Sequence, residues 1–153
     1  MRAVLQRVSE ASVISDGVLM GKIERGLMIL LGVRDGDTEA DAEALAEKIS
    51  KLRIFSDEND KLNLSVKDLG GSALVVSNFT LMADYKKGNR PSYTDSASPD
   101  VANKLYEYFI SCMKSKEIHT ESGVFGADMK VSIVNDGPIT IVMDSEVLLR
   151  KGV

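Results

Sequence analysis

The sequence contains a single cysteine, Cys112, and a single histidine, His119, among its 153 residues. One cysteine cannot form a disulfide within the chain, which fits a reducing compartment. A metal site of imidazole and thiolate ligands is not expected, because it needs several such side chains. A serine–histidine–aspartate triad would have to use His119, for which a surface position at the start of a strand is the simpler interpretation. We therefore expect no metal, no cofactor and no imidazole base.

Other features are also missing. No run of about 18 apolar residues occurs, so we expect no membrane span, and the first residues lack the apolar core and cleavage site of a signal peptide. Neither a GxxxxGK[ST] nor a GxGxxG phosphate loop is present. The net charge of −4 argues against a broad surface for DNA or RNA, although it allows a small local phosphate contact. These absences favour a cytoplasmic location.

Hydrophobic residues make up 44% of the chain, which is enough to bury a core in a single domain spanning residues 1–153. Asp16-Gly17 is a strong hairpin signal between two extended segments. Alternating or continuous apolar residues predict roughly seven or eight strands in all. Segment 11–14 continues the first strand, and 53–55 is a short candidate; the segments involved are 2–8, 11–14, 18–23, 26–33, 53–55, 72–76, 118–121, 130–134 and 139–143.

Two helices are predicted by apolar residues at helical spacing. The first follows Thr38 and Asp41, which have the spacing of a capping box. The second starts at a candidate N-cap, Ser98, with Pro99 in the first helical position. Because strands and helices do not alternate regularly, we expect an α/β (α+β) fold in which a mostly antiparallel, barrel-like sheet is packed by these two main helices. The apolar stripes comprise Ala42, Leu45, Ile49 and Leu52 in the first helix, and Ala102, Leu105, Phe109 and Cys112 or Met113 in the second.

Two short segments stand out beside strand-like apolar runs: Ser77-Asn78-Phe79-Thr80-Leu81 and Asn135-Asp136-Gly137-Pro138-Ile139-Thr140. In the second segment a Gly-Pro pair interrupts two predicted strands. Proline donates no backbone hydrogen bond, so a sheet tolerates it only at an edge, an end or a bulge. Such a joint can present carbonyl oxygens at a fixed angle for recognition. A plain turn between two strands is the simpler alternative.

The most basic loop of the chain is Lys86-Lys87-Gly88-Asn89-Arg90. Three cations within five residues, on a loop that contains a glycine, could hold one or two phosphates. An ordinary solvated loop with surface charges is the simpler alternative. The sequence by itself leaves both interpretations open.

Together these segments resemble the D-aminoacyl-tRNA deacylase family, of the D-tyrosyl-tRNA deacylase type, over the whole length of the chain. Residues 1–8 are similar to the first strand of the family, residues 77–81 to its SQxxT motif and residues 87–92 to its basic loop. Residues 125–129 and 135–140 are similar to its NxGPxT region. Asn78 departs from the glutamine that is usual in the family, so a hydrogen bond of the longer side chain could be lost or re-routed through water.

The resemblance implies a hydrolase that acts on carboxylic ester bonds and cleaves the ester between a D-amino acid and the 3′-terminal adenosine of tRNA. Mischarged glycyl-tRNA is implied as a second substrate, because glycine has no side chain to reject. The implied role is translation quality control by chiral proofreading. The implied partners are a second copy of the chain, with active sites at the subunit interface, and the acceptor 3′ end of aminoacyl-tRNA, without a membrane or DNA.

In that family the Gly-Pro pair, here Gly137-Pro138, has a cis peptide bond and enters the pocket of the partner subunit. Its two carbonyls would hold the α-amino group of the substrate, so an L side chain would meet the main chain while a D side chain points outward. The implied catalytic residues are Ser77, Asn78, Phe79 and Thr80; those for substrate binding are Phe125, Met129, Asn135, Gly137, Pro138 and Thr140; and those for tRNA contact are Lys86, Lys87 and Arg90. Phe79, Phe125 and Met129 are candidates for an apolar floor under the adenosine, with core packing as the alternative.

The cleavage step has two candidate routes. Thr80 offers a hydroxyl nucleophile, but the sequence shows no neighbouring histidine or lysine that could deprotonate it. We favour substrate-assisted hydrolysis, in which the ribose 2′-hydroxyl positions or activates a water and backbone N–H groups near Phe79 and Thr80 stabilise the oxyanion. The alternatives are a non-catalytic homodimeric protein that binds adenosine or aminoacyl-tRNA, and an ordinary serine or threonine esterase, which lacks a credible base.

Overall fold

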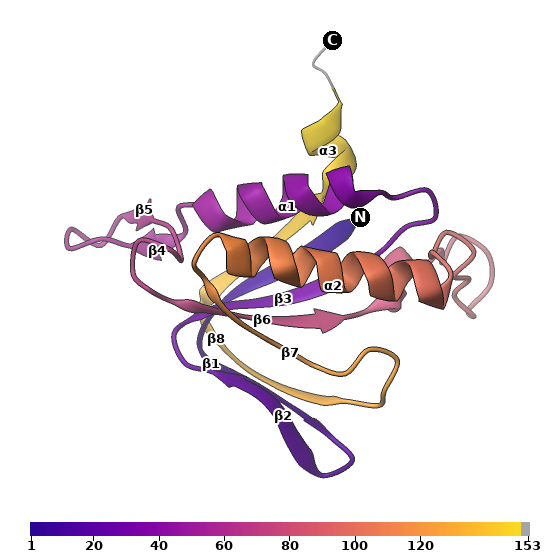
Figure 1. Cartoon of the computed structure of the whole chain (residues 1–153), viewed down its shortest axis with the longest axis horizontal. Helices are drawn as coiled ribbons and strands as arrows, with labels where there is room; N and C mark the ends of the chain where they lie inside the picture. Colours follow the sequence, from indigo (N-terminus) through magenta and orange to yellow (C-terminus); the bar gives the residue numbers. More distant parts are fainter. Residues whose placement is uncertain (151–153) are drawn as a thin grey trace.

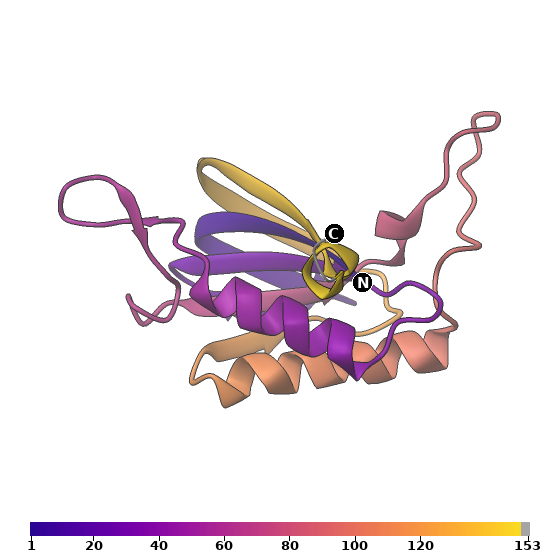
Figure 2. The ribbon, with the colours of Figure 1, turned by 90° about the horizontal axis from the view of Figure 1, so that it is seen from above.

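The computed structural model describes residues 1–150 and consists of a strongly curved sheet with two long helices across one face (Figure 1). The helices, α1 (Glu39–Lys51) and α2 (Pro99–Ser115), lie side by side (Figures 1 and 2). None of the helices in this range is long and apolar enough to cross a membrane. The strands are β1 (Arg2–Ser15), β2 (Val18–Ile23), β3 (Gly26–Gly32), β4 (Phe55–Ser56), β5 (Leu62–Leu64), β6 (Ser72–Ser77), β7 (His119–Ser122) and β8 (Lys130–Asp144), with a 3-10 helix η1 (Phe79–Met82) and a short helix α3 (Ser145–Leu149).

The long first strand organises the sheet. Along one edge, β1 pairs with β3 through residues 2–8 and with β2 through residues 11–15, and along its other edge it pairs with β8. All three of these pairings are antiparallel, whereas β3–β6 and β6–β7 are parallel. The expected mixed fold with a mostly antiparallel, barrel-like sheet is therefore confirmed. The two parallel pairings were not predicted, because each joins strands that are far apart in the sequence.

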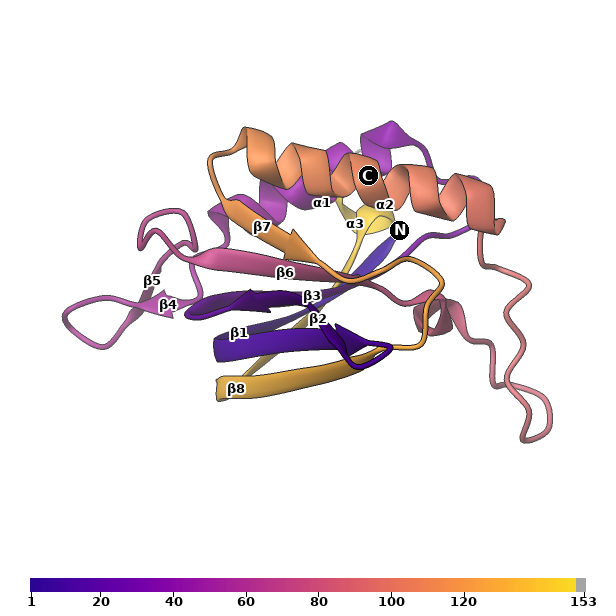
Figure 3. The ribbon, with the colours of Figure 1, turned by 60° about the horizontal axis from the view of Figure 1, so that its bottom comes forward.

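The sheet curls until β2 lies near β6 and β7 (Figure 3). Gly21 of β2 permits this approach, since a β-carbon there would lie 3.0 Å from the carbonyl oxygen of Ser122. Leu74 of β6 reaches the same point. The curled end of the sheet encloses its own apolar cluster, which comprises Val8, Ala11, Val13, Ile23, Met28, Leu74 and Val76.

Local signals in the sequence account for the ends of most elements. Asp16 and Gly17 both have positive φ, +50° and +74°, and turn β1 into β2 as expected for a two-residue hairpin. The capping box of α1 is present, with the Thr38 N–H donating to Asp41 Oδ2 at 2.9 Å. Helix α2 begins at Pro99 as predicted, although the Ser98 side chain makes no capping hydrogen bond.

The main core lies between the two helices and the sheet. Its members include Leu5 and Leu31 from the sheet, Leu45 and Ile49 from α1, and Phe109 from α2, all of them fully or almost fully buried. Burying one such side chain stabilises a fold by about 1.5–3 kcal/mol. This core fixes the helices over the sheet and thereby places the start of α2 beside the end of β6.

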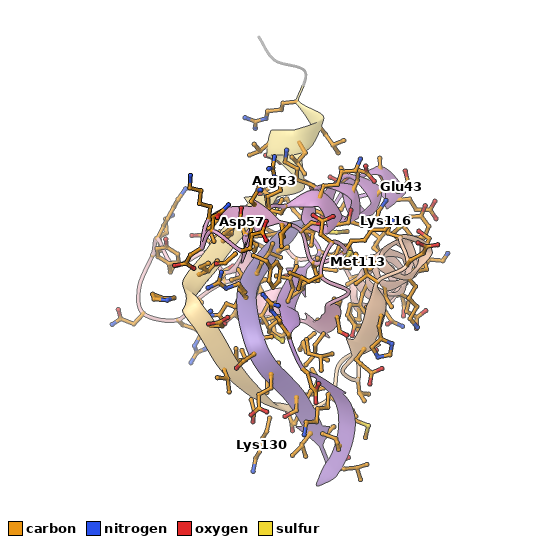
Figure 4. The ribbon with its side chains drawn as sticks, turned by 90° about the vertical axis from the view of Figure 1, so that its left-hand side faces the viewer. Glu43, Arg53, Asp57, Met113, Lys116 and Lys130 are labelled. Carbon is orange, nitrogen blue, oxygen red and sulfur yellow. The ribbon has the colours of Figure 1, made fainter. Side chains whose placement is uncertain are left out.

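Polar side chains on the outer side of the molecule join neighbouring elements (Figure 4). Lys116, at the end of α2, pairs with Glu47 of α1 across the helix seam. Arg53 donates from Nε to the carbonyl oxygen of Asn63 at 2.9 Å, and Asn63 donates to Asp57 at 3.1 Å, which closes the small β4–β5 hairpin. These contacts lie at the helix end of the molecule, far from the start of β8 (Figure 4).

Several details differ from the sequence-based expectation. The segments predicted as separate strands at 130–134 and 139–143 form one strand, β8, that carries a bulge. The short strand expected at 53–55 lies at Phe55–Ser56 and pairs with β5, which was not predicted. Neither η1 nor α3 was predicted, because each is shorter than the window in which apolar periodicity can be recognised.

Candidate active site

The first half of the site forms where β6 ends. Strand β6 is buried between β3 and β7, and the Asn78 N–H donates to the carbonyl oxygen of Leu31 at 2.8 Å. The chain then turns sharply into η1. Asn78 caps this short helix, because its side-chain oxygen accepts from the Thr80 backbone N–H at 3.2 Å and from the Thr80 hydroxyl. The turn thus places Ser77, Asn78 and Phe79 at the edge of a cavity.

This cavity has a volume of about 560 Å³, within the size range of small-molecule sites. Five parts of the chain meet around it: the residue after β3, the end of β6, the loop before α2, the start of α2 and the loop between β7 and β8. Its lining residues are Val33, Ser77, Asn78, Phe79, Tyr93, Ser96, Ala97, Pro99, Ala102, Phe125, Gly126, Ala127, Asp128 and Met129. Most of this surface is apolar, so the cavity suits a group with apolar surface and a few polar atoms.

Five of the residues proposed from the sequence line the cavity together: Ser77, Asn78, Phe79, Phe125 and Met129. Thr80 does not line it. The Thr80 side chain is exposed and bonded to Asn78, so its hydroxyl lies at the rim of the cavity. The lining residues in the described range include no histidine, lysine or cysteine, and Asp128 is the one carboxylate among them.

Sequence reasoning missed Tyr93 and Ser96, which lie in the part of the loop directly before α2. The Tyr93 ring meets the Phe79 ring edge-on, with centroids 5.0 Å apart and an angle of 72° between the planes. The Ser96 hydroxyl donates to the carbonyl oxygen of Phe79 at 3.3 Å. Phe79 itself is 57% exposed, so more than half of its surface remains open to a ligand. In the sequence, the only signal that pointed to these residues was their position directly before a predicted helix start.

Tyr106 of α2 supports the opposite wall of the cavity, where Phe125 lies. Its hydroxyl donates to the carbonyl oxygen of Val75 at 3.0 Å, and burial raises the pKa of this hydroxyl, which therefore stays protonated. The Tyr106 ring lies 5.9 Å from the Phe125 ring, centroid to centroid. Tyr106 thus ties the end of β6 to the Phe125 side of the cavity.

The second segment singled out in the sequence forms the bulge of β8. Gln6 pairs with Thr140 and Val8 pairs with Asn135, so the single residue Arg7 stands opposite four residues, 136–139. The Gly137–Pro138 peptide bond is cis, as the resemblance implied. Both residues are exposed. A β-carbon at Gly137 would lie 2.2 Å from the Ile139 nitrogen, so only glycine fits this position.

Four hydrogen bonds brace the base of the bulge. Arg7 donates from Nε to the carbonyl oxygen of Asp136 at 2.8 Å and from Nη1 to that of Ile54 at 3.1 Å. The Asn135 amide donates to the carbonyl oxygens of Arg7 and Ile139, each at 3.0 Å. Asn135, proposed from the sequence as a substrate-binding residue, therefore uses its side chain to hold the bulge. Arg7 was not predicted, because only the fold places it opposite these residues.

The Thr140 side chain, like that of Asn135, makes a hydrogen bond within the chain. Its hydroxyl accepts from Gln6 Nε2 at 3.0 Å across the β1–β8 pair. Asn135, Gly137, Pro138 and Thr140 are all absent from the lining of the cavity formed by the same chain. The structure thus separates the proposed site residues into two groups, one around the cavity and one at the bulge.

The three cations of the basic loop lie on a third feature, a hairpin-like extension between η1 and α2 (Figure 2). Lys86, Lys87 and Arg90 are exposed there. Two hydrogen bonds between Asp84 and Ser92, each with an N···O distance of 2.8 Å, close the extension. Tyr93 follows directly, so the basic residues are connected to the cavity wall.

The family model described as D-Tyr-tRNA(Tyr) deacylase matches residues 4–144. The chain belongs to this family. A D-aminoacyl-tRNA deacylase of Koribacter versatilis (strain Ellin345) is 56% identical over 146 residues, 95% of this chain and 98% of the relative. A protein of the same name from Thermosipho africanus (strain TCF52B) is 55% identical with the same coverage.

Solved structures of this family's fold also align over nearly the whole chain. The structure of the c-Myc DNA Unwinding Element Binding Protein has a TM-score of 0.88 and 38% identity, and covers 94% of this chain and 98% of its own. A structure described as a probable eukaryotic D-amino acid tRNA deacylase has a TM-score of 0.80 at 17% identity with the same coverage, and this likeness bears on the fold alone.

Proposed function

We propose that this protein hydrolyses the ester bond of D-aminoacyl-tRNA, and of mischarged glycyl-tRNA, releasing the free D-amino acid or glycine and tRNA. The observation that carries this proposal is the family match over residues 4–144, which includes every segment that builds the cavity and the bulge. The reaction would serve translation quality control. Its place would be the cytoplasm, which a chain with one cysteine fits.

The cavity is the proposed site for the terminal adenosine and the ester. Phe79, Phe125 and Met129 supply apolar surface against which a purine can stack. Ser77 and Ser96 add hydroxyl groups at the same wall, where they can bond to ribose or base atoms. The cavity binds the nucleoside, and no feature of it needs to recognise a particular amino-acid side chain.

The bulge is the proposed chiral filter, supplied by a second copy of the chain in a homodimer. Gly137 and Pro138 are exposed, held by Arg7 and Asn135, and lie outside the cavity of their own chain. A partner subunit's cavity would receive them, and their carbonyl oxygens would accept hydrogen bonds from the substrate's α-ammonium group. An L side chain would then collide with the main chain, whereas a D side chain would point to solvent.

The chemical step needs little from side chains. Water attacks the ester carbonyl, the tetrahedral oxyanion collapses, and the ribose 3′-oxygen leaves and takes up a proton. The vicinal 2′-hydroxyl positions the water. The Phe79 N–H, which opens η1 and has no acceptor within that helix, is the first donor available to the oxyanion. The Thr80 N–H can join it only by exchanging its bond to Asn78. One such donor contributes about 10²–10³ in rate.

The test is to incubate the protein with D-aminoacyl-tRNA, the matching L-aminoacyl-tRNA and glycyl-tRNA, and to measure the remaining ester. We expect loss of the D and glycyl esters and persistence of the L ester. Binding of all three without ester loss would favour the non-catalytic alternative. Loss of D and L esters at similar rates would favour an ordinary hydroxyl esterase and would contradict the chiral filter.

A further inference from the structure

Residues 83–97 form an arm that extends away from the body between η1 and α2 (Figures 2 and 3). The paired hydrogen bonds between Asp84 and Ser92 close its outer part. Gly88 turns the tip with a φ of +64°, a conformation that other residues disfavour. A further hydrogen bond of 3.0 Å, from Lys86 N–H to Asp84 Oδ1, fixes the start of the tip. The arm is thus a closed hairpin of defined shape.

Tyr85 lies at the start of this tip and is 80% exposed. In the described part of the chain, its ring stacks on no other aromatic ring. Isolated exposed apolar residues are common on protein surfaces. Tyr85 differs from these because it is a large, flat ring that directly precedes two lysines. An aromatic face beside cations is the arrangement by which proteins hold single-stranded nucleic acid, with bases stacked on the ring and phosphates on the charges.

The arm also concentrates positive charge in an acidic protein. The chain has a net charge of −4, yet Lys86, Lys87 and Arg90 lie within five positions. Within residues 1–150, none of the three is within ion-pairing distance of a carboxylate. Unpaired cations on a projecting hairpin attract phosphate more effectively than the same charges neutralised in surface ion pairs.

The arm is continuous with the candidate active site. Tyr93, on the segment of the arm that leads back to α2, lines the main cavity. A second, smaller hollow of about 300 Å³ lies at its foot, where Tyr85 and Lys86 meet Arg2 and Arg34. Arg2 and Arg34 are both paired with Asp144, so the free cations at this place belong to the arm. A single-stranded nucleic acid that extends out of the main cavity would therefore lie next to the arm.

We propose that the arm holds the unpaired nucleotides that precede the terminal adenosine of the substrate. Tyr85 stacks on one unpaired base, and Lys86, Lys87 and Arg90 contact the phosphates beside it. This inference rests on the proposed function, because it takes the main cavity as the site of the terminal adenosine. It commits the arm to single-stranded RNA and predicts no role for it in recognising the amino acid.

The test compares two non-cleavable probes by titration. One is a short RNA hairpin with an unpaired 3′ end that carries a D-amino acid through an amide, and the other is the corresponding aminoacyl-adenosine alone. We expect Tyr85→Ala to weaken binding of the RNA probe by about fivefold or more relative to the nucleoside probe. Tyr85→Trp is expected to restore it, because tryptophan keeps a stacking face.

The charge contribution is read from salt dependence. A variant with Lys86→Ala, Lys87→Ala and Arg90→Ala should lower the salt slope of RNA binding by about two, since each single-strand phosphate contact adds about 0.7. The matched control replaces three exposed lysines on the helices, Lys48, Lys104 and Lys114, and should leave the slope unchanged. Equal affinities of Tyr85→Ala and the parent for the RNA probe would overturn the inference, as would equal slopes for the arm and control variants. Because neither probe is cleaved, failure of the proposed hydrolysis would appear separately, with charged tRNA as substrate.

Discussion

The side-chain oxygen of Asn78 accepts hydrogen bonds from both the backbone N–H and the hydroxyl of Thr80. An amide oxygen is an acceptor and not a base, so this contact orients the hydroxyl without removing its proton. Asparagine reaches Thr80 as an N-cap two residues before it, a geometry that short side chains favour. The residue that departs from the usual family glutamine therefore organises the turn at the cavity rim.

Thr80→Ala should retain most of the ester hydrolysis. Because the Thr80 hydroxyl has no base beside it, we expect kcat to fall by less than about tenfold, far below the loss typical of a missing nucleophile. The measurement is single-turnover deacylation of D-aminoacyl-tRNA. Thr80→Ser serves as the control that keeps the hydroxyl. Abolished turnover in Thr80→Ala, with binding and fold intact, would instead identify the hydroxyl as the nucleophile.

Asn78→Asp should separate stability from catalysis. Aspartate caps a helix start as well as asparagine does, so the free energy of unfolding should change by less than about 0.5 kcal/mol. Its negative charge would lie next to the oxyanion, and we expect kcat to fall by about tenfold or more. Urea unfolding and single-turnover rates measure the two effects. Unchanged kcat would mean that the oxyanion forms away from the start of η1.

Pro138→Ala should reduce chiral selectivity. Proline restricts the backbone that presents the bulge carbonyls, and alanine allows more conformations. We expect the ratio of D to L ester hydrolysis to fall by about tenfold or more, measured with matched D- and L-aminoacyl-tRNA. Ser132→Ala, at an exposed position of the same strand, is the control. Full selectivity in Pro138→Ala would show that the bulge is not the filter.

Arg7→Lys should loosen the bulge while preserving the charge. Lysine cannot reproduce the fork that donates to both Asp136 and Ile54, so one or both hydrogen bonds are lost. We expect the free energy of unfolding to fall by about 1–2 kcal/mol and selectivity to fall in parallel. Thermal unfolding and the D-to-L rate ratio report these effects. A loss of stability without a change in selectivity would assign Arg7 a purely structural role.

Asp144 should make stability depend on pH in the acid range. Partial burial opposes its ionisation, but the Arg34 guanidinium and the Glu146 backbone N–H outweigh burial and lower the pKa of Asp144 to about 2. A carboxyl with a lowered folded-state pKa stabilises the fold above its unfolded pKa of about 4, and this stability is lost as pH falls toward 2. Asp144→Asn should therefore cost about 1–2 kcal/mol at pH 7 and progressively less below pH 4. Urea unfolding over this pH range checks it, and equal costs at pH 7 and pH 2.5 would contradict it.

Structural features that depend on short-range interactions can be predicted from the sequence itself. The Asp16-Gly17 hairpin, the Thr38–Asp41 capping box and the start of α2 at Pro99 each depend on residues within one turn of each other. The motif residues 77–81 and 135–140 stood out beside strand-like apolar runs, and their resemblance to known family motifs anticipated the family. The pattern of predicted strands and helices anticipated the fold class.

Long-range pairing accounts for what was not anticipated. The gap between 130–134 and 139–143 looked like a break between strands, because proline donates no backbone hydrogen bond and a sheet tolerates it only at an edge, an end or a bulge. In the folded chain, β1 continues past this gap and pairs on both sides of it, so the four residues are expelled as a bulge. A sequence does not state its register against a partner strand more than a hundred residues away. Arg7 could therefore not be linked to Asp136 beforehand.

The sequence by itself determined the local turns, the helix starts and the chemical identity of both motifs, since each depends on neighbouring residues only. Tertiary structure alone decided that Ser77, Phe79 and Phe125 share one cavity while Gly137 and Pro138 stand outside it. The physical reason is that burying the apolar faces of the helices and the curled sheet fixes which loops meet. That burial is a property of the whole chain, and no segment carries it alone.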